Sequence, residues 1–357
     1  MKNLSILLLF FSLASANSPS PLDEPSLPAP KPHIVVIVID DFGHNNIGYH
    51  AATNEAANEI ITPTLDSLAL EGLVLDNHVV FRFCSPTRSA LLTGRNPIHV
   101  NVLNSDLSQA NFSDPVSGFA GIPRPMTALP EKLKIAGYET IGCGKYHVGL
   151  ATPTHLPSGR GFEKSLFYLD GANTQFSNAC TGWCSQSGLT VDLWAQAGPA
   201  YGYNNSLSCS NTNQGPNCPY QDLVFTNFSV NAIREHDPTT PLFLYFAPHS
   251  IHVSADGLIL EVPTEQEEKF NYINNTFRRR YAAITNLIDE YIGNIIAELK
   301  ATNLWDNTLL LVTAVSYLKI GFSLTLETLT RLLIVSNHSF IIIVINVTFL
   351  LFTSGQR

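Results

Sequence analysis

Two adjacent carboxylates, Asp40 and Asp41, directly follow the apolar run HIVVIVI at residues 33–39. Such a pair at the end of a strand has two interpretations. In the first, one carboxylate caps the following turn and the other is solvated. In the second, both share a divalent cation, because like charges this close need a positive partner. The pair alone leaves both interpretations open.

Other groups that could do chemistry stand in three short runs. Cys84 and Arg88 lie in CSPTR, Lys145 and His147 lie in GKYHVG at residues 144–149, and His252 ends HSIH. A thiol, two cations and imidazoles can act as nucleophile, charge stabiliser and proton donor. A lone His is more often a surface or satisfied core residue, so its placement in the fold decides its role.

The elements that must position these residues alternate between β-rich runs and helical patterns. We predict strands at residues 33–39, 72–81, 139–143, 242–247 and 308–313, and helices at 63–72, 89–93, 126–136, 222–235 and 277–300. This alternation predicts an α/β fold with a mostly parallel sheet flanked by helices. Ligands of such sheets bind at the carboxyl ends of the strands. Polar residues far apart in sequence should therefore meet at one edge of the sheet.

Taken in order, the runs resemble the sulfatase family. C-x-P-x-R followed by L-x-T-G-R is that family's signature, and here it reads CSPTR at residues 84–88 and LTGR at 92–95. The upstream Asp-Asp-x-Gly, the GKYHVG run and LPSGRGF at 156–162 also stand in the family's order and spacing. Asn77, the Cys84 region, the GKYHVG run and LFLYFAPHSIH at 242–252 place the resemblance nearest the arylsulfatase B-like branch. It covers about residues 33 to 314.

The resemblance implies an alkaline-phosphatase-like N-terminal sulfatase domain and a calcium ion held by Asp40, Asp41 and residue 84. In the family the signature Cys is oxidised by a formylglycine-generating enzyme. One hydroxyl of the hydrated aldehyde attacks sulfur, and loss of a proton from the other expels sulfate, which divides a difficult hydrolysis into two easier steps.

The resemblance also implies roles for the remaining groups. Arg88 would hold the hydrated aldehyde, and Lys145 would bind the sulfate as a fixed positive charge. His147 would help deprotonate the second hydroxyl, and His252 would protonate the leaving alcohol. His249 stands where the branch often has Gln, so the resemblance assigns it no role.

The pattern departs from the family after the strand predicted at residues 308–313. There the family places Asp-Asn-Gly, which completes its calcium site, whereas this chain continues with Val315, Ser316 and Tyr317. The family's later sulfate-binding Lys and smaller C-terminal domain have no counterpart in the sequence. We therefore expect an incomplete catalytic domain at residues 33–314 and a divergent apolar tail at 315–357.

The tail has three interpretations. It is a product of truncation, alternative splicing or a gene-model error; a membrane anchor, since residues 332–352 have about the length of a span; or a core strand and helix of unusual composition. Ser336, Asn337, His338 and Asn346 would be costly in lipid. Loss of the resemblance in mid-motif favours the first, and we expect membrane contact only through 332–352.

The first residues indicate secretion. Lys2, the apolar run at residues 6–13 and the small residues 14–16 form a signal peptide at 1–16, and a Pro-rich linker follows at 17–32. We accordingly expect a secreted, lysosomal or otherwise lumenal protein. Glycosylation sequons at Asn111, Asn204, Asn227 and Asn274 agree with this.

Four of the six cysteines, Cys180, Cys184, Cys209 and Cys218, cluster in a Gly/Asn/Ser-rich region. A cluster of irregular spacing without a nearby His favours two disulfides over a zinc site, with the connectivity open. The formal net charge of −9 gives no reason to expect a nucleic-acid partner.

The leading hypothesis is a sulfuric ester hydrolase that acts on sulfated small molecules or carbohydrates. The second is an inactive sulfatase-like binding protein or a truncated product, because the Asp-Asn ligands are missing. The third is a related phosphoester or phosphonate hydrolase, since CSPTR does not separate sulfate from phosphate.

Overall fold

The structure is a computed structural model that describes residues 30–51, 58–75, 78, 80–81, 84–103, 121–180, 190–196, 198–200, 209–215, 217–254, 259–315 and 340–344. The chain divides into residues 1–31 and 32–357, and the elements below belong to the second unit. The predicted signal peptide at 1–16 and residues 17–29 of the predicted linker lie outside the described residues.

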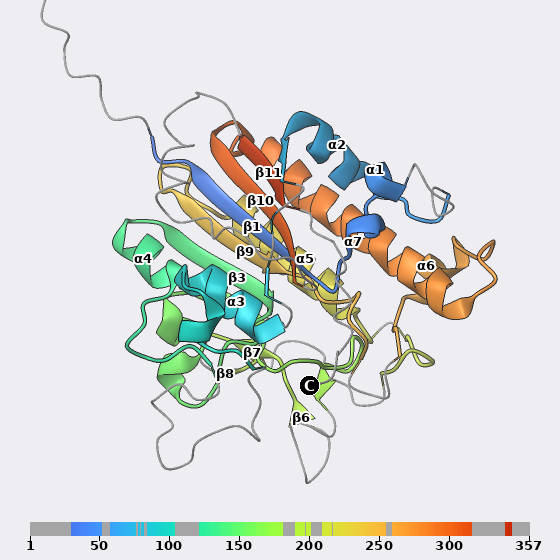
Figure 1. Ribbon diagram of the computed structural model, residues 1–357, viewed down its shortest axis with the longest axis horizontal. Helices are drawn as coiled ribbons and strands as arrows, with labels where there is room; N and C mark the ends of the chain where they lie inside the picture. The colour runs from blue at the N-terminus through green and yellow to red at the C-terminus, as the bar shows by residue number, and fades with distance from the viewer. Residues whose placement is uncertain are drawn as a thin grey trace, which may run out of the picture. The chain divides into compact units, whose positions relative to one another are not determined.

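In the described part of the chain the elements alternate as predicted (Figure 1). The strands are β1 His33–Asp40, β2 Leu73–Val74, β3 Glu139–Lys145, β4 Lys164–Tyr168, β5 Ala179–Cys180, β6 Thr190–Val191, β7 Trp194–Ala195, β8 Gly198–Pro199, β9 Leu242–Ala247, β10 Thr308–Val315 and β11 Phe340–Val344. The α-helices are α1 Gly48–Ala51, α2 Pro63–Glu71, α3 Cys84–Thr93, α4 Leu129–Ile135, α5 Gln221–Arg234, α6 Thr264–Glu268 and α7 Thr276–Ala301.

The main sheet has the strand order β2-β11-β10-β1-β9-β3-β4-β7-β8. All pairs from β2 to β4 are parallel, and only β7 and β8 add antiparallel pairs at one edge. β1 lies between β10 and β9, with Asp40 opposite Val315. The predicted mostly parallel α/β sheet is confirmed, and its strands end at a common edge.

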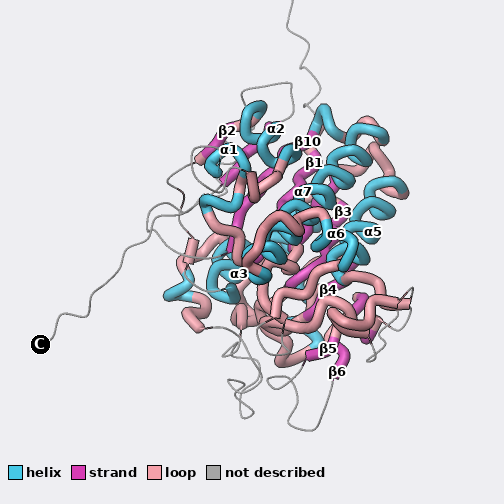
Figure 2. The backbone as a smooth tube through the Cα atoms, turned by 90° about the vertical axis from the view of Figure 1, so that its right-hand side faces the viewer, coloured by secondary structure: helices cyan, strands magenta, loops and turns pink. Residues whose placement is uncertain are grey.

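Two cores lie on opposite faces of this sheet. Val35 and Ile37 of β1 pack into one core with α2, α5 and α7, and Val36 and Val38 pack into the other, which includes the α3 side chain Leu92. Figure 1 shows α3 and α4 on the face opposite α2 and α7, and Figure 2 shows α5 and α7 side by side in front of the strands. Burial on both faces explains why β1 is a continuous apolar run rather than an alternating one.

Three predicted elements differ from the structure. The strand predicted at residues 72–81 is described as a strand only at Leu73–Val74. The helix expected from residue 89 begins at Cys84, because Pro86 lies in the first turn, where its missing N–H removes no helical hydrogen bond. The helix expected from residue 126 begins at Leu129, where Pro130 occupies the first turn.

The predicted apolar tail contributes one described element. Residues 340–344 form β11, which pairs in parallel with β10 and β2. For these five residues the structure supports the core-strand interpretation of the tail. None of the helices that the structure describes combines the length and apolar character needed to cross a membrane.

The structure contains one of the two expected disulfides, between Cys209 and Cys218. The side chains of Cys180 and Cys184 are not among those that the structure describes. Of the sequons, Asn227 and Asn274 are exposed, while Asn111 and Asn204 lie outside the described residues.

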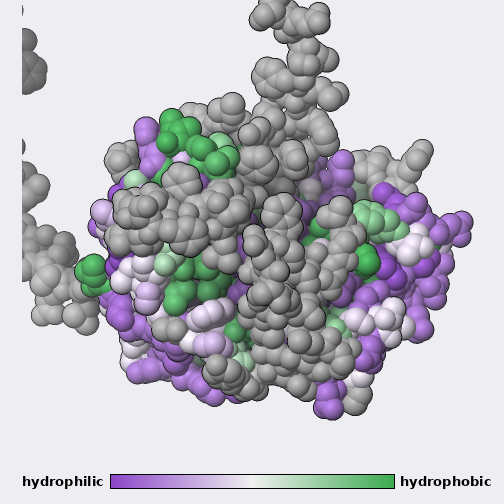
Figure 3. Space-filling model, turned by 90° about the horizontal axis from the view of Figure 1, so that it is seen from below, coloured by the Kyte–Doolittle hydropathy of each residue, from purple (hydrophilic) through white to green (hydrophobic). Residues whose placement is uncertain are grey.

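On the face in Figure 3, described hydrophobic residues form small separate patches between hydrophilic ones. That face therefore shows no single broad apolar surface among the described residues.

Candidate active site

The candidate site lies where the central parallel strands end. Asp40 is the last residue of β1, Lys145 is the last residue of β3, and the turn after β9 carries His252. Backbone hydrogen bonds join the end of β1 to both of its neighbours: the Asp40 N–H donates to the carbonyl of Pro248, just after β9, at 3.2 Å, and the Asp41 N–H donates to the carbonyl of Val315 in β10 at 3.1 Å. The sheet register thus places Asp40, Lys145 and the turn that carries His252 at one edge of the sheet.

A buried ion cluster forms the floor of the site. The Lys145 ammonium donates to Asp40 Oδ2 at 2.6 Å, and Arg88 Nη2 lies 3.2 Å from Asp40 Oδ1, with all three side chains fully buried. Burial alone would raise the pKa of Asp40, but the charges of Lys145 and Arg88 more than offset it and hold this pKa well below its usual range. Asp40 is therefore a fixed anion.

Arg88 is held from two further sides. Its Nη1 donates to the Lys145 carbonyl at 3.1 Å and to the Tyr245 hydroxyl at 3.5 Å. Because Arg88 comes from α3 and Tyr245 from β9, these bonds fix the start of α3 against the sheet. The sequence predicted a role for Arg88 but not for Tyr245, whose position inside an apolar strand gave no polar signal.

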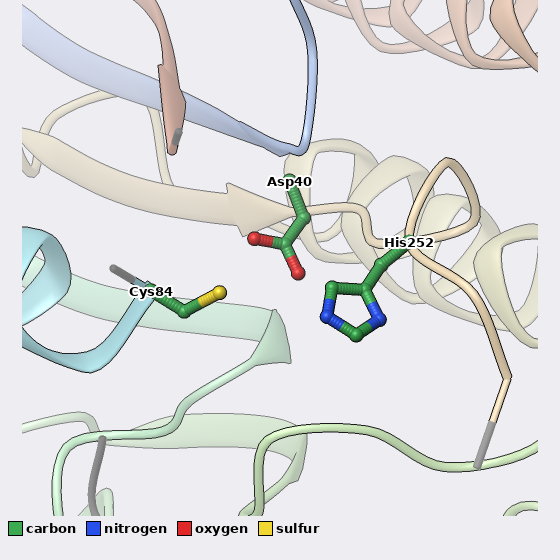
Figure 4. Close-up of side chains that lie close together, drawn as sticks. All are labelled: Asp40, Cys84 and His252. Atoms are coloured by element: carbon green, nitrogen blue, oxygen red, sulfur yellow. The ribbon is translucent and has the colours of Figure 1, made fainter. Parts of the chain in front are cut away.

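Cys84 is the first residue of α3 and is a free, partly buried thiol. Burial and the nearby charge of Asp40 raise the pKa of this thiol to about 11, although Lys145 and Arg88 oppose the shift. An unmodified thiol with this pKa is almost entirely protonated at neutral pH and is a weak nucleophile. The side chain points toward Asp40 and His252 (Figure 4).

His252 faces the same space from the turn after β9. Its Nδ1 lies 2.8 Å from the Val253 carbonyl, which can only accept, so Nδ1 carries a proton and Nε2 is the reactive nitrogen. The Nε2 atom lies 3.8 Å from Asp41 Oδ2. Burial and repulsion from Asp40 raise the pKa of Asp41.

Ligand-type atoms of Asp40, Cys84 and His252 all lie within 4.8 Å of one another. Neither Asp41 nor His147 belongs to this group. His147 is buried beyond the end of β3 with φ of 49°, and a Cβ at Gly171 would lie 3.1 Å from its ring. Three of the predicted site residues, Asp40, Cys84 and His252, thus converge directly. Arg88 and Lys145 contact this group through their ion pairs with Asp40. Asp41 contacts it through His252.

A buried network that the sequence did not predict fixes the turn that presents His252. Asp222 of α5 accepts hydrogen bonds from the backbone N–H groups of His249 and Ser250, at 3.1 and 2.9 Å, and from the Ser250 hydroxyl. The His249 carbonyl then accepts from the His252 N–H at 2.8 Å. His249, left without a role by the resemblance, is therefore part of this support. The pattern of α5 identified Asp222 only as a residue of the helix.

The donor atoms fit calcium in type. Calcium takes about six to eight oxygen ligands, and Asp40 and Asp41 supply carboxylates at the end of β1. Asp40 Oδ1 is buried and accepts no hydrogen bond within the described part of the chain. However, Arg88 and Lys145 balance the two carboxylates, so the local formal charge is zero. The site fits calcium in donor chemistry and favours weak binding.

Comparisons with known proteins agree with this arrangement. A family model described as Sulfatase matches residues 32–314. Arylsulfatase J of Mus musculus is 32% identical over 284 residues, which cover 79% of this chain and 42% of that protein. N-acetylgalactosamine-6-sulfatase of Homo sapiens is 28% identical over 290 residues, which cover 79% of this chain and 49% of that protein. The chain spans about half the length of these relatives.

Solved structures show the same fold. The crystal structure of Ps i-CgsB in complex with k-i-k-neocarrahexaose superposes with a TM-score of 0.59 at 25% identity, covering 78% of this chain and 57% of that chain. A second structure, described as the crystal structure of Ps i-CgsB, superposes with a TM-score of 0.58 at 27% identity and covers 78% of this chain and 57% of that chain.

Proposed function

This chain belongs to the sulfatase family, and on that premise we propose that it hydrolyses sulfate esters at the edge of the sheet where Asp40, Cys84 and His252 converge. The family resemblance predicted from its motifs is thereby confirmed. The observation that carries the proposed activity is the convergence itself, because it joins a nucleophile position, fixed cations and an imidazole in one site.

We propose that Cys84 acts after oxidation to formylglycine by a formylglycine-generating enzyme. The raised pKa of the thiol supports this, because the unmodified side chain is a poor nucleophile. A hydrated aldehyde supplies a nucleophilic hydroxyl and a second hydroxyl whose deprotonation releases sulfate. Cys84 is the first residue of α3, and this position also suits an anionic substrate, because a helix N-terminus carries partial positive charge.

The cations of the floor would bind and orient the sulfate group. Lys145 has three N–H donors, and Asp40 engages one of them. Arg88 is anchored through Nη1 to the Lys145 carbonyl and Tyr245, so its guanidinium plane is fixed before substrate arrives. Fixed donors stabilise developing negative charge without reorganisation during the reaction.

Proton transfer to the leaving alcohol is assigned to His252. Its Nδ1–H is engaged by the Val253 carbonyl, so Nε2 exchanges the proton on the side of the site. His147 would assist the second hydroxyl, as the resemblance implies. Calcium, held by Asp40, Asp41 and the converted residue 84, would polarise the sulfate oxygens.

The substrate class that we propose is a sulfated carbohydrate. One similar structure is described as a complex with neocarrahexaose, and one relative is an N-acetylgalactosamine-6-sulfatase. A secreted or lysosomal location would bring the chain to such substrates. The proposed domain is residues 33–314, followed by the tail at 315–357.

The balanced charge at the site favours one alternative, a sulfatase-like chain that binds sulfated carbohydrate without turnover. The deciding experiment is co-expression of the full chain with a formylglycine-generating enzyme, confirmation of the aldehyde by mass spectrometry, and an aryl sulfate assay with calcium present. We expect turnover that is lost in Cys84→Ala. Absence of turnover from chain confirmed to carry the aldehyde would reject the hydrolase in favour of the binding protein.

A further inference from the structure

The group of Asp40, Cys84 and His252 has unusual donors for a calcium site. As translated, it offers one carboxylate oxygen, one thiol sulfur and one imidazole nitrogen within 4.8 Å of one another. Calcium selects oxygen ligands, whereas borderline-soft ions such as Zn²⁺ select sulfur, nitrogen and carboxylate oxygen. Before oxidation of Cys84, the three side chains therefore match a different metal.

His252 has the orientation of a metal ligand. Its Nδ1–H donates to the Val253 carbonyl at 2.8 Å, which leaves the lone pair of Nε2 directed away from that bond. Metal-binding histidines nearly always donate their other ring N–H in this way, because the second bond fixes the tautomer and the ring plane. This hydrogen bond is independent of the distances within the group.

Asp40 also has a ligand atom to offer. Lys145 engages Oδ2, whereas Oδ1 is buried and accepts no hydrogen bond from the described residues, although Arg88 Nη2 lies 3.2 Å away. Ligand atoms around a tetrahedral Zn²⁺ are about 3.5 Å apart. The observed limit of 4.8 Å requires a closure of about 1 Å. Small rotations of the Cys84 and His252 side chains, both of which are partly exposed, can supply it.

Local charge favours a divalent ion only while residue 84 is a cysteine. Asp40 and Asp41 are balanced by Arg88 and Lys145. A Cys84 thiolate adds one negative charge, which a neutral hydrated aldehyde does not. The thiol proton is released to solvent when the metal binds.

We propose that the chain with unoxidised Cys84 binds Zn²⁺ through Asp40, Cys84 and His252, with the fourth position open. Conversion to the aldehyde removes the sulfur ligand and the site. The proposal concerns the unconverted chain and does not depend on whether the converted chain hydrolyses sulfate esters.

Cobalt is the probe, because a thiolate bound to Co²⁺ gives a charge-transfer absorption in the near ultraviolet. The full chain is produced in cells that lack a formylglycine-generating enzyme, Cys84 is confirmed by mass spectrometry, and the metal-free protein is titrated with Co²⁺. We expect one Co²⁺ per chain, the charge-transfer band, and displacement by Zn²⁺ but not by Ca²⁺. His252→Ala removes a ligand, so it should weaken binding by more than the roughly tenfold that loss of an outer-shell partner costs.

Cys143→Ser is the matched control, because Cys143 is the other free cysteine in the described part of the chain and lies in the core. This variant should keep the band, and Cys84→Ser should lose it. If Cys84→Ser fails to fold, alkylation of Cys84 in the parent chain gives the same comparison. The proposal is overturned if folded parent chain gives no band at saturating Co²⁺, or if the band survives loss of the Cys84 thiol.

Discussion

The Nζ atom of Lys145 lies 2.6 Å from Oδ2 of Asp40, and neither side chain is exposed to solvent. Because β3 and β1 are separated by β9 in the sheet, this ion pair spans a neighbouring strand and ties together the ends of three strands. It also fixes the electrostatics of the site, because Asp40 is the anion that Lys145 and Arg88 share. Changes at either partner should affect stability and ligand binding together.

Lys145→Met should lower the free energy of unfolding by about 3–5 kcal/mol, because it leaves a buried carboxylate without one of its two cations. Urea unfolding followed by circular dichroism measures the change. Lys164→Met is the matched control: its pair with Glu139 is at the surface, with the lysine 44% exposed, and should cost at most about 1 kcal/mol. Equal losses in the two variants would contradict the assigned role of the buried pair.

His252→Gln should slow turnover of the converted enzyme by about 10²–10⁴-fold on an aryl sulfate with a poor leaving group. The loss should shrink on 4-nitrophenyl sulfate, because a good leaving group needs little protonation. Steady-state kinetics on both substrates measure this split. His99→Gln, at an exposed position, should leave both rates unchanged. A loss that is the same on both substrates would remove His252 from the proton-donor role.

The central fold could be predicted because buried parallel strands leave a strong sequence signal. HIVVIVI and LFLYFA are apolar on both faces and were recognised as strands, and their carboxyl ends then placed Asp40 and His252 at one edge. The short strand pairs at β7 and β8 carry no such signal, because two residues are too few to show a period. The parallel strand β11 was indistinguishable from part of a membrane span, since its five residues are apolar in both cases.

The site could be predicted in its members but not in its contacts. The motifs identified Asp40, Cys84 and Lys145, yet no local pattern specifies that Lys145 pairs with Asp40 across 105 positions of sequence. Supporting groups such as Asp222 are missed for the same reason. Their partners are backbone N–H groups, which every sequence contains, so the hydrogen bonds appear only in the folded chain.

Asp222→Asn should impair catalysis by loosening the turn that carries His252. The three hydrogen bonds from His249 and Ser250 all end on Oδ2, so an amide oxygen there can keep them only as weaker, neutral hydrogen bonds. The amide NH2 group would take the place of Oδ1, which lies 3.3 Å from the His249 N–H, so two donors would face each other, at a cost of about 1–3 kcal/mol. A displacement of about 1 Å at His252 can lower kcat by about 10²-fold. Kinetics and the NMR signals of the His252 ring report both effects. Asp237→Asn, at an exposed position, should move neither, and unchanged His252 signals in Asp222→Asn would refute the link.

Calcium should bind the converted chain with a Kd of about 10⁻³ M or weaker, because few charged ligands give low affinity. Lys145→Met removes one of the cations that balance Asp40 and Asp41, so it should tighten calcium binding by about tenfold or more. Calorimetric titration measures both constants. Lys164→Met should leave the affinity unchanged, because its charge lies on the surface pair with Glu139. Micromolar binding by the parent chain, or no gain in Lys145→Met, would contradict the charge balance.

Asp192 should make the protein more stable in acid. Its carboxylate accepts from the N–H groups of Leu169 and Asp170, and burial raises its pKa to about 6 although these hydrogen bonds oppose the shift. A pKa raised in the folded state means that folding favours the protonated form. The contribution is therefore complete below the ordinary value of 3.8 and is lost as pH rises through about 6.

Between pH 4 and 7 this loss should reach about 2 kcal/mol, at about 1.4 kcal/mol for each unit of pKa difference. Urea unfolding across this range compares the parent chain with Asp192→Asn, whose lower stability should vary less with pH because the titrating group is gone. Asp306→Asn, at an exposed position, should keep the slope of the parent. Parallel profiles for the parent and Asp192→Asn would show that Asp192 does not bind its proton more tightly in the folded chain. A flatter profile for Asp192→Asn alone would assign the acid preference to the turn after β4.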